Sequence, residues 1–169
     1  MAKFVLIAGP CVLEGEGCGL EVAQELKRQL RDLEPQIDFY FKASFDKANR
    51  TSNESFRGPG MEQGLGTLKK IRAQTGFKLL TDFHHPEQAS EVAELVDVLQ
   101  VPAFLCRQTD MIAAGSEAAK KHARILNVKK GQFLAPWDAK NIVEKSASYG
   151  LDVRKQLWIT ERGTTFGYN

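Results

Sequence analysis

The stretch "IDFYFKASFDKANRTSNESFRGPG", residues 37–60, joins a short apolar run to a dense group of polar and charged residues. The run Ile37–Phe41 has the length and the aromatic content of a strand, and Lys42 follows it directly. Turn segments are usually polar, so the stretch taken alone is more typical of a solvated loop. The remainder of the chain distinguishes a loop from the floor of an anion-binding site.

Short apolar runs of this kind alternate with longer segments whose apolar residues recur at helical spacing. Mostly uninterrupted apolar runs are typical of parallel strands buried on both faces. The alternation predicts one α/β domain over residues 1–169. The six expected strands are Phe4–Ala8, Ile37–Phe41, Phe77–Leu80, Leu95–Val101, Ile125–Val128 and Leu157–Thr160.

Helical spacing predicts helices over residues 20–33 and 61–71. Pro86 is well placed for a first helical turn, because proline is favoured at that position. Asp138 is the expected N-cap of a helix that runs through Ile142. No internal repeat or linker interrupts this organisation.

Polar and ionisable residues follow all six expected strands. In (β/α) barrels and doubly wound sheets alike, ligands bind at the carboxyl ends of the strands, so we expect these residues to form one mouth. Lys42 and Lys129 directly end apolar runs, where an ammonium is costly unless it meets an anion. A single strand-end lysine could simply reach solvent, but six cations in register favour a site for phosphate or carboxylate groups. The cations are Lys42, Lys47, Arg50, Arg107, Lys129 and Arg162, against the acids Asp82 and Glu161.

Composition excludes several other classes. The chain has 169 residues, 43% hydrophobic and 26% charged, with a formal net charge of +2, which is too small to favour nucleic acid. The run Phe4–Pro10 is too short for a membrane span or a signal peptide. We therefore expect a cytoplasmic protein with no nucleic-acid or membrane partner. Cys11, Cys18 and Cys106 form no CxxC pair, which indicates free thiols.

Six motifs along the chain resemble the 3-deoxy-D-manno-octulosonate-8-phosphate synthase family. They are "IAGPCVLE", "FKASFDKANRTSNESFRGPGMEQG", "TDFHHP", "QVPAFLCRQTD", "NVKKGQFLAPWD" and "TERGTTFGYN". They are long, stand in the family's order and cover the whole chain. The resemblance implies a (β/α)8 TIM barrel, of which about six βα units are present. It also implies condensation of phosphoenolpyruvate (PEP) with arabinose 5-phosphate and water, on the route to the lipopolysaccharide sugar Kdo.

The main alternative is the sister synthase of the shikimate pathway, which makes 3-deoxy-arabino-heptulosonate 7-phosphate from PEP and erythrose 4-phosphate. That family shares the Gly-Pro-Cys start, but its sugar-phosphate loop usually reads Lys-Pro-Arg-Thr-Ser. Residues 46–51, Asp-Lys-Ala-Asn-Arg-Thr, are similar to the arabinose 5-phosphate form instead. A sialic-acid-type synthase is a third and weaker alternative.

The resemblance assigns roles residue by residue. It implies that Lys42, Lys47, Lys129 and Arg162 hold the phosphate and carboxylate of PEP, with Gln100, Pro102 and Ala103 lining that pocket. It implies that Asn49, Arg50 and Thr51 receive arabinose 5-phosphate, and that Asp82 binds its hydroxyls. Lys42, Lys47, Asp82 and Lys129 are the implied catalytic residues. Arg107 is implied to reach a neighbour's sugar phosphate, so we expect a homotetramer. Two dianionic substrates repel one another, which is why counter-charge and fixed orientation are needed.

Cys11 is the expected metal ligand. One subclass of the family has a cysteine here and uses a divalent ion, whereas the other has an asparagine and uses none. A thiolate is a credible ligand for Fe, Zn, Mn or Cd, and the alternative is a buried free cysteine. Cys18 and Cys106 are expected to be structural. His84 and His85 stay open, because the family usually has one His followed by Glu.

The length departs from the resemblance. A (β/α)8 barrel typically takes about 250 residues, and the family's other metal ligands, a His, a Glu and an Asp, belong to its last two βα units. An arc of six strands would leave two parallel edges unpaired. We therefore expect either an incomplete record of a longer chain or a true truncation that is inactive alone. The second case leaves a non-catalytic sugar-phosphate-binding remnant as a further alternative.

Overall fold

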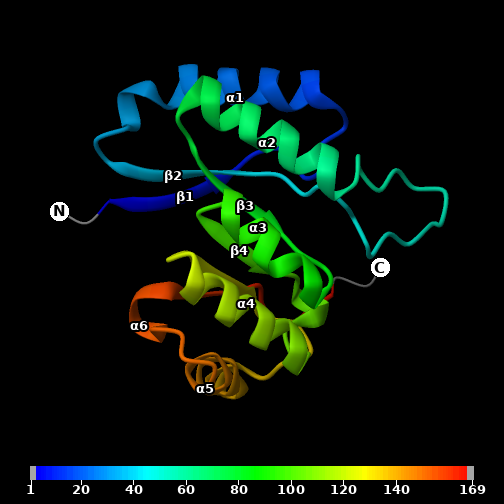
Figure 1. Cartoon of the computed structure of the whole chain (residues 1–169), viewed down its shortest axis with the longest axis vertical. Helices are drawn as coiled ribbons and strands as arrows, with labels where there is room; N and C mark the ends of the chain where they lie inside the picture. The colour runs from blue at the N-terminus through cyan, green and yellow to red at the C-terminus, as the bar shows by residue number, and fades with distance from the viewer. Residues whose placement is uncertain (1–2, 167–169) are drawn as a thin grey trace. The chain divides into compact units, whose positions relative to one another are not determined.

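Strands and helices alternate along residues 3–166, the part of the chain that the computed structural model describes (Figure 1). The chain divides into two units, residues 1–81 and 82–169, and each is an α/β arrangement with parallel strands. The α/β class and the six strands are confirmed, while a single domain stays a prediction. The last three residues of the "TERGTTFGYN" motif lie outside the described residues.

Unit 1 consists of strands that alternate with two long helices. Its elements, with η for a short 3-10 helix, are β1 (Phe4–Ala8), α1 (Glu16–Leu30), η1 (Arg31–Leu33), β2 (Ile37–Lys42), α2 (Met61–Thr75) and β3 (Lys78–Asp82). The last residue of β3, Asp82, is the first residue of unit 2. β1 pairs with β2 and β2 with β3, both in parallel register. Helix α1 packs against α2, and α2 ends at Gly76 in the left-handed conformation that favours glycine.

The core of unit 1 is built from the inner faces of these elements. Phe41, Leu68, Ile71 and Leu79 are fully buried. Phe77, expected in the strand, instead precedes β3, where its ring meets that of Phe39 edge-on with centroids 4.6 Å apart.

Unit 2 repeats the pattern with shorter helices. Its elements are η2 (Pro86–Gln88), α3 (Ala89–Leu95), β4 (Val98–Val101), η3 (Ala103–Leu105), α4 (Thr109–Lys121), β5 (Ile125–Lys129), η4 (Pro136–Ala139), α5 (Lys140–Ser148), α6 (Val153–Gln156) and β6 (Leu157–Thr160). β4 pairs with β5 and β5 with β6, both in parallel register. Phe83, Leu99, Ile112 and Leu126 are fully buried in its core.

Several sequence expectations are wrong in detail. The expected strand Leu95–Val101 begins only at Val98, because Leu95 is the last residue of α3 and Val96 and Asp97 connect that helix to the strand. Asp138 is not an N-cap, since it lies inside η4, and α5 has Ala139 at its N-cap. The first expected helix begins at Glu16 and gives way to η1 after Leu30.

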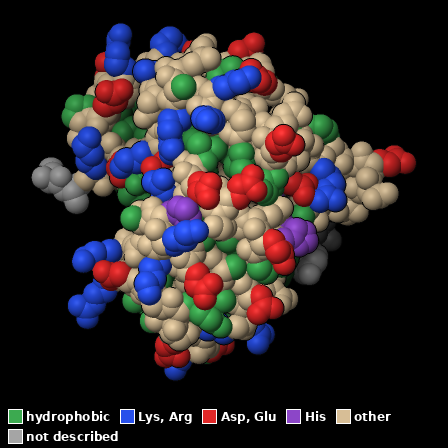
Figure 2. All heavy atoms as spheres, in the orientation of Figure 1, with side chains coloured by type: hydrophobic (Ala, Val, Ile, Leu, Met, Phe, Trp, Pro, Cys, Tyr) green, Lys and Arg blue, Asp and Glu red, His purple; other side chains and the backbone are tan. Residues whose placement is uncertain are grey.

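Burial on both faces is also wrong for β1. Phe4, Val5 and Ile7 are all exposed, Phe4 to 69%. Among the described residues of unit 1, β1 pairs with β2 on one side only, so it is an end strand. Figure 2 shows basic and acidic side chains interspersed on the face in view. No helix of residues 3–166 is long and apolar enough to cross a membrane.

Candidate active site

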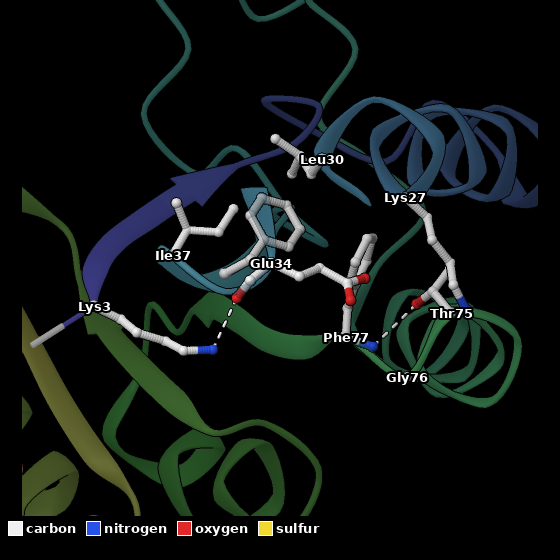
Figure 3. A pocket seen from close by; sticks show the side chains of 9 residues that line it. Lys3, Lys27, Leu30, Glu34, Ile37, Thr75, Gly76 and Phe77 are labelled. Atoms are coloured by element: carbon white, nitrogen blue, oxygen red, sulfur yellow. Dashed lines mark hydrogen bonds between the residues drawn. The ribbon is translucent and has the colours of Figure 1, made fainter. Parts of the chain in front are cut away.

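Near the amino ends of the strands in unit 1, the side chains of Lys3 and Lys78 contact polar groups of the same unit. Lys78 forms a 2.6 Å ion pair with Asp38, and the ammonium of Lys3 donates to the carbonyl of Glu34 at 2.8 Å (Figure 3). A pocket of about 260 Å³ opens here between the apolar walls of Ile37 and Phe77. Lys3 and Lys78 thus have partners within unit 1 at this edge, and Lys27 is a further cation that lines the pocket.

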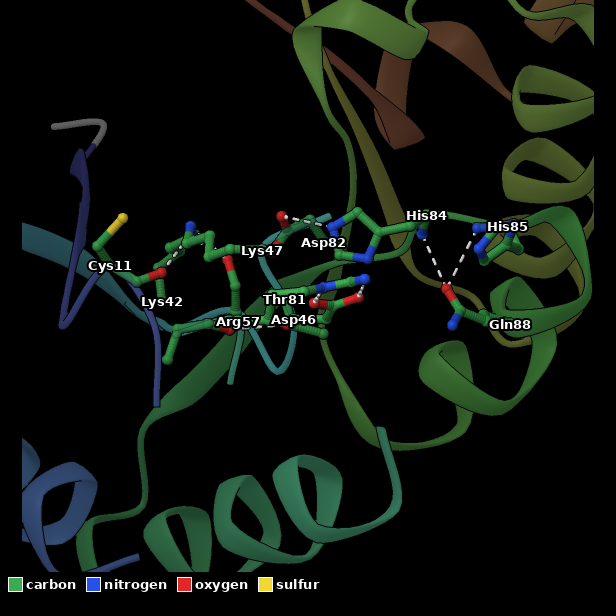
Figure 4. A network of polar contacts seen from close by, with 12 residues as sticks. Cys11, Lys42, Asp46, Lys47, Arg57, Thr81, Asp82, His84, His85 and Gln88 are labelled. Atoms are coloured by element: carbon green, nitrogen blue, oxygen red, sulfur yellow. Dashed lines mark hydrogen bonds and ion pairs between the residues drawn. The ribbon is translucent and has the colours of Figure 1, made fainter. Parts of the chain in front are cut away.

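The carboxyl end of β2 is arranged differently, around a group of four residues that we call the basic cluster: Cys11, Lys42, Ser44 and Lys47 (Figure 4). The ammonium groups of Lys42 and Lys47 each donate to the hydroxyl of Ser44 at 2.8 Å. Lys42 also donates to the carbonyl of Cys11 at 3.3 Å. Ser44 is fully buried, and its hydroxyl holds the positively charged ammonium groups of both lysines close together. The two ammonium groups are thereby held at one place, where an acidic group of a ligand can accept hydrogen bonds from both.

The backbone brings Cys11 to this place. Gly9 has φ +154°, and a Cβ at this position would lie 2.2 Å from the carbonyl oxygen of Lys42, so only glycine fits. Three residues later, Val12 forms a parallel bridge with Ser44, and Leu13 donates its N–H to the Ser44 carbonyl at 3.0 Å. The segment after β1 therefore runs beside the segment after β2.

The basic cluster lowers the pKa of the Cys11 thiol below its ordinary value. The largest cause is hydrogen bonding with the side chain of Lys47. Partial burial raises the pKa, and the charges of Lys47, Lys42 and Arg50 lower it again. The thiolate is thus favoured at an exposed position, which is the form that binds metals or attacks electrophiles.

The loop that joins β2 to α2 has two parts: a neck, where Asp46 and Lys47 contact Arg57, and an exposed tip, residues 49–51. The guanidinium of Arg57 donates two hydrogen bonds to the carboxylate of Asp46, one of them 2.9 Å long. The backbone N–H of Lys47 donates to the Arg57 carbonyl at 2.6 Å. At the tip, Asn49, Arg50 and Thr51 are exposed, with Arg50 donating to the carbonyl of Phe56 at 3.2 Å. The three residues expected to receive the sugar phosphate therefore stand together on a braced loop.

In unit 2, a chain of polar side chains crosses the three strands. Asn127 donates through Nδ2 to Oε1 of Gln100 at 3.1 Å, and Thr160 donates through Oγ1 to Oδ1 of Asn127 at 2.8 Å. Gln100 and Asn127 are buried within β4 and β5. Lys129 ends β5 beside Thr160 in the strand register, which puts its side chain on the same face as this chain.

Asp82 and His84 form a buried pair at the start of unit 2. The ring Nε2 of His84 lies 3.3 Å from Oδ2 of Asp82, and both side chains are less than 10% exposed. The Oε1 atom of Gln88 accepts from the backbone N–H groups of His84 and His85 (Figure 4). The two histidines therefore differ: the ring of His84 is held against the carboxylate, whereas His85 is exposed.

The loops after β5 and β6 are joined by Lys130. This side chain is 1% exposed, and its ammonium donates to the carbonyls of Gly131, Leu134 and Gly163 at 3.1–3.3 Å. It also lies 3.2 Å from a carboxylate oxygen of Glu161. The pKa of Glu161 is lowered first by the N–H of Gly163 and then, against slight burial, by Lys130.

The other residues expected in unit 2 have simpler surroundings. Arg162 is exposed and donates its backbone N–H to Glu161 at 2.9 Å. Pro102 precedes η3, and Ala103 is buried at its start. Arg107 is exposed next to a pocket of about 390 Å³ that Lys145 also lines. Cys106 is buried as expected of a structural residue, but Cys18 is exposed on α1.

The residues described do not make a metal centre by themselves. No group of three or more His, Cys, Asp or Glu side chains within residues 3–166 could hold a metal ion. Cys11 supplies a favoured thiolate, but the charges that lower its pKa are the cations Lys47, Lys42 and Arg50, none of which is a metal ligand. One thiolate provides neither the number nor the geometry of ligands that a stable site requires.

Four residues take part in these arrangements without being expected from the sequence: Ser44, Asn127, Thr160 and Lys130. All but Lys130 are neutral and lie in or next to apolar runs, where charge gives no signal. A polar residue in the middle of an apolar run, as Asn127 is, was the one available sign.

Comparison with known proteins adds independent findings. The model of the DAHP synthetase I family matches residues 2–169. Two relatives named "2-dehydro-3-deoxyphosphooctonate aldolase" come from Desulfatibacillum aliphaticivorans and Wolinella succinogenes. The first is 49% identical over 99% of this chain and 58% of its own length. The second is 52% identical over 98% of this chain and 64% of its own length. The chain thus spans about three fifths of these relatives.

Proposed function

We propose, because the chain belongs to the DAHP synthetase I family, that it serves the condensation of PEP with arabinose 5-phosphate. The products are 3-deoxy-D-manno-octulosonate 8-phosphate and phosphate, the reaction of 2-dehydro-3-deoxyphosphooctonate aldolases. The observation that carries the proposal is the basic cluster, in which two lysines converge on Ser44 at 2.8 Å. The identity of about 50% to relatives of that name supports the choice of reaction.

We propose the following roles in unit 1. Lys42 and Lys47 bind an acidic group of PEP, since they are fixed side by side before any ligand arrives. Asn49, Arg50 and Thr51 receive the phosphate of the sugar, for which the exposed guanidinium of Arg50 suits two oxygens at once.

In unit 2, Gln100, Lys129 and Arg162 are proposed to contact PEP, with Pro102 and Ala103 lining its surroundings. Asp82 is proposed to hold the sugar hydroxyls, and the contact with His84 keeps its carboxylate in one orientation. Counter-charge and orientation together lower the barrier to joining C3 of PEP to the aldehyde carbon.

A (β/α)8 barrel, to which these six strands would contribute, remains part of the proposal, as does a homotetramer in the cytoplasm. The exposed position of Arg107 is compatible with contact to a neighbouring copy. Light scattering of the purified protein tests the tetramer, for which a monomeric mass would be the contradicting result.

We also propose that Cys11 contributes a thiolate to a divalent Fe, Zn, Mn or Cd ion, together with ligands from outside residues 3–166. When bound, such an ion would polarise the aldehyde or activate water. Cys11→Asn should lower the metal content measured by elemental analysis, and Cys18→Asn is the control. In a full-length protein, chelation should abolish turnover and added Mn or Cd should restore it.

Phosphate release tests the proposed function. PEP should release phosphate only when arabinose 5-phosphate is present, and much more slowly with erythrose 4-phosphate. Comparable kcat/KM for the two sugars would contradict the choice of substrate. Binding of PEP and arabinose 5-phosphate without release would instead favour a non-catalytic sugar-phosphate-binding remnant.

A further inference from the structure

The chain of hydrogen bonds from Thr160 through Asn127 to Gln100 has a direction. A side-chain amide has one end that accepts and one end that donates. Thr160 donates to the accepting end of Asn127, so the donating end of Asn127 faces the carbonyl of Gln100. This bond uses the carbonyl oxygen of Gln100 and leaves its N–H groups to donate elsewhere.

The direction matters because a carboxylate or phosphate oxygen only accepts hydrogen bonds. If the Gln100 amide were turned over, it would present a carbonyl oxygen to the anion and repel it. In the low dielectric of a buried site, the wrong orientation costs more than it would in water. Gln100 and Asn127 are 4% and 1% exposed, so their surroundings meet this condition.

Both ends of the chain lie in unit 2 on the face that carries Lys129. Asn127 and Lys129 are two residues apart on β5 and so share a face, and Thr160 is the register partner of Lys129. Gln100 is likewise the register partner of Asn127. The oriented amide of Gln100 and the ammonium of Lys129 are therefore donors on one side of the same three strands.

We propose that Asn127 and Thr160 are positioning residues that hold Gln100 as a hydrogen-bond donor to an acidic group of PEP. Neither residue needs to contact the ligand. This inference rests on the proposed function, because it takes PEP as the anion. It adds that the orientation of the neutral Gln100 amide, and not positive charge alone, determines how strongly unit 2 binds its ligand.

A double-mutant cycle tests the proposal by calorimetric measurement of the Kd for PEP. Thr160→Val removes the hydroxyl at nearly constant volume and should raise the Kd about 3–10-fold, the value of one net hydrogen bond. Thr160→Ser keeps the hydroxyl and should restore the wild-type Kd. In an Asn127→Leu background, Thr160→Val should change the Kd less than about twofold, because the link to Gln100 is already lost.

A second measurement uses Asn127→Asp. Its carboxylate can only accept, so Gln100 would turn over and weaken PEP binding at pH 8. Burial raises the pKa of such a carboxyl, while the ammonium of Lys129 on the same face lowers it; once protonated, the acid can donate to Gln100 again. The ratio of variant to wild-type Kd should therefore fall towards 1 as the pH decreases through the pKa of this carboxyl, which a pH titration of the ratio locates. Damage to the fold would not be reversed by acid.

The outcomes distinguish failure of the proposed function from failure of the positioning roles of Asn127 and Thr160. Absence of PEP binding in the wild-type chain contradicts the proposed function and this inference with it. Binding in the wild type, with equal effects of Thr160→Val in both backgrounds, would mean that Thr160 contacts the ligand directly. That result, or no effect of Thr160→Val at all, overturns the positioning roles and leaves the proposed function intact.

Discussion

The basic cluster of unit 1 and the polar chain of unit 2 would meet the anionic ligand proposed above in opposite ways. In unit 1, two lysines meet on the buried hydroxyl of Ser44 at the start of a loop. In unit 2, the neutral amides of Gln100 and Asn127 are held inside strands by hydrogen bonds. The buried lysine of this unit, Lys130, donates hydrogen bonds to three backbone carbonyls of the protein itself. A lysine at the end of a strand is therefore no evidence of a ligand site until its partners are known.

The comparison depends most on Lys130 having a structural role. Lys130→Met should lower the free energy of unfolding by about 3 kcal/mol, because it leaves buried carbonyls without a donor. Urea denaturation measures the loss. Lys140→Met, at an exposed position of α5, should stay within about 0.5 kcal/mol of the wild type. Equal stability of the two variants would remove the contrast between Lys130 and the lysines of the basic cluster.

Gly9→Ala tests whether the backbone builds the basic cluster. The added methyl would collide with the Lys42 carbonyl at a φ that disfavours alanine, so we expect a loss of about 2–3 kcal/mol of stability. Gly66→Ala is the matched control, since a Cβ there meets nothing within 4 Å on α2. It should raise the stability by about 0.5–1 kcal/mol. The opposite signs should appear in the same thermal-melting experiment.

Arg50→Ala separates the tip of the loop from the basic cluster. Loss of a charge-assisted contact of about 1.5–3 kcal/mol should raise the KM for arabinose 5-phosphate roughly 10–100-fold, with far less change for PEP. Arg57→Ala, which opens the neck instead, should affect both substrates. Equal effects of Arg50→Ala on the two KM values would mean that the loop is misassigned.

The smallest effect concerns the thiol. Because Lys47 lowers the pKa of Cys11, the rate of its alkylation by iodoacetamide should fall as the pH decreases through that lowered pKa. Lys47→Met should move this midpoint to higher pH and slow the reaction several-fold at pH 7. Lys69→Met on α2 should leave the profile unchanged. Mass spectrometry of the Cys11 peptide, in the presence of a chelator, follows the reaction.

The fold and the charged part of the site were accessible from the sequence because both signals are local. An apolar run followed by a lysine marks the end of β2 whatever lies around it. Asn127 and Thr160 gave no comparable signal, since their roles depend on side chains from neighbouring strands. His84 and His85 are adjacent and chemically identical, and they differ only in their surroundings: the ring of His84 contacts Asp82, whereas His85 is exposed. The exposure of β1 was missed for the same reason, because pairing partners are not encoded within a run.

The neck of the loop between β2 and α2 has a consequence for how such a protein can change over generations. Asp46 and Arg57 close the loop by their side chains and Lys47 and Arg57 by their backbones, so the tip contributes little to the stability of unit 1. Under the proposed roles, substitutions at Asn49, Arg50 and Thr51 would therefore alter the preference for the sugar more than they alter folding. Substrate preference could then change there one residue at a time, while the contacts of the neck keep the loop in place.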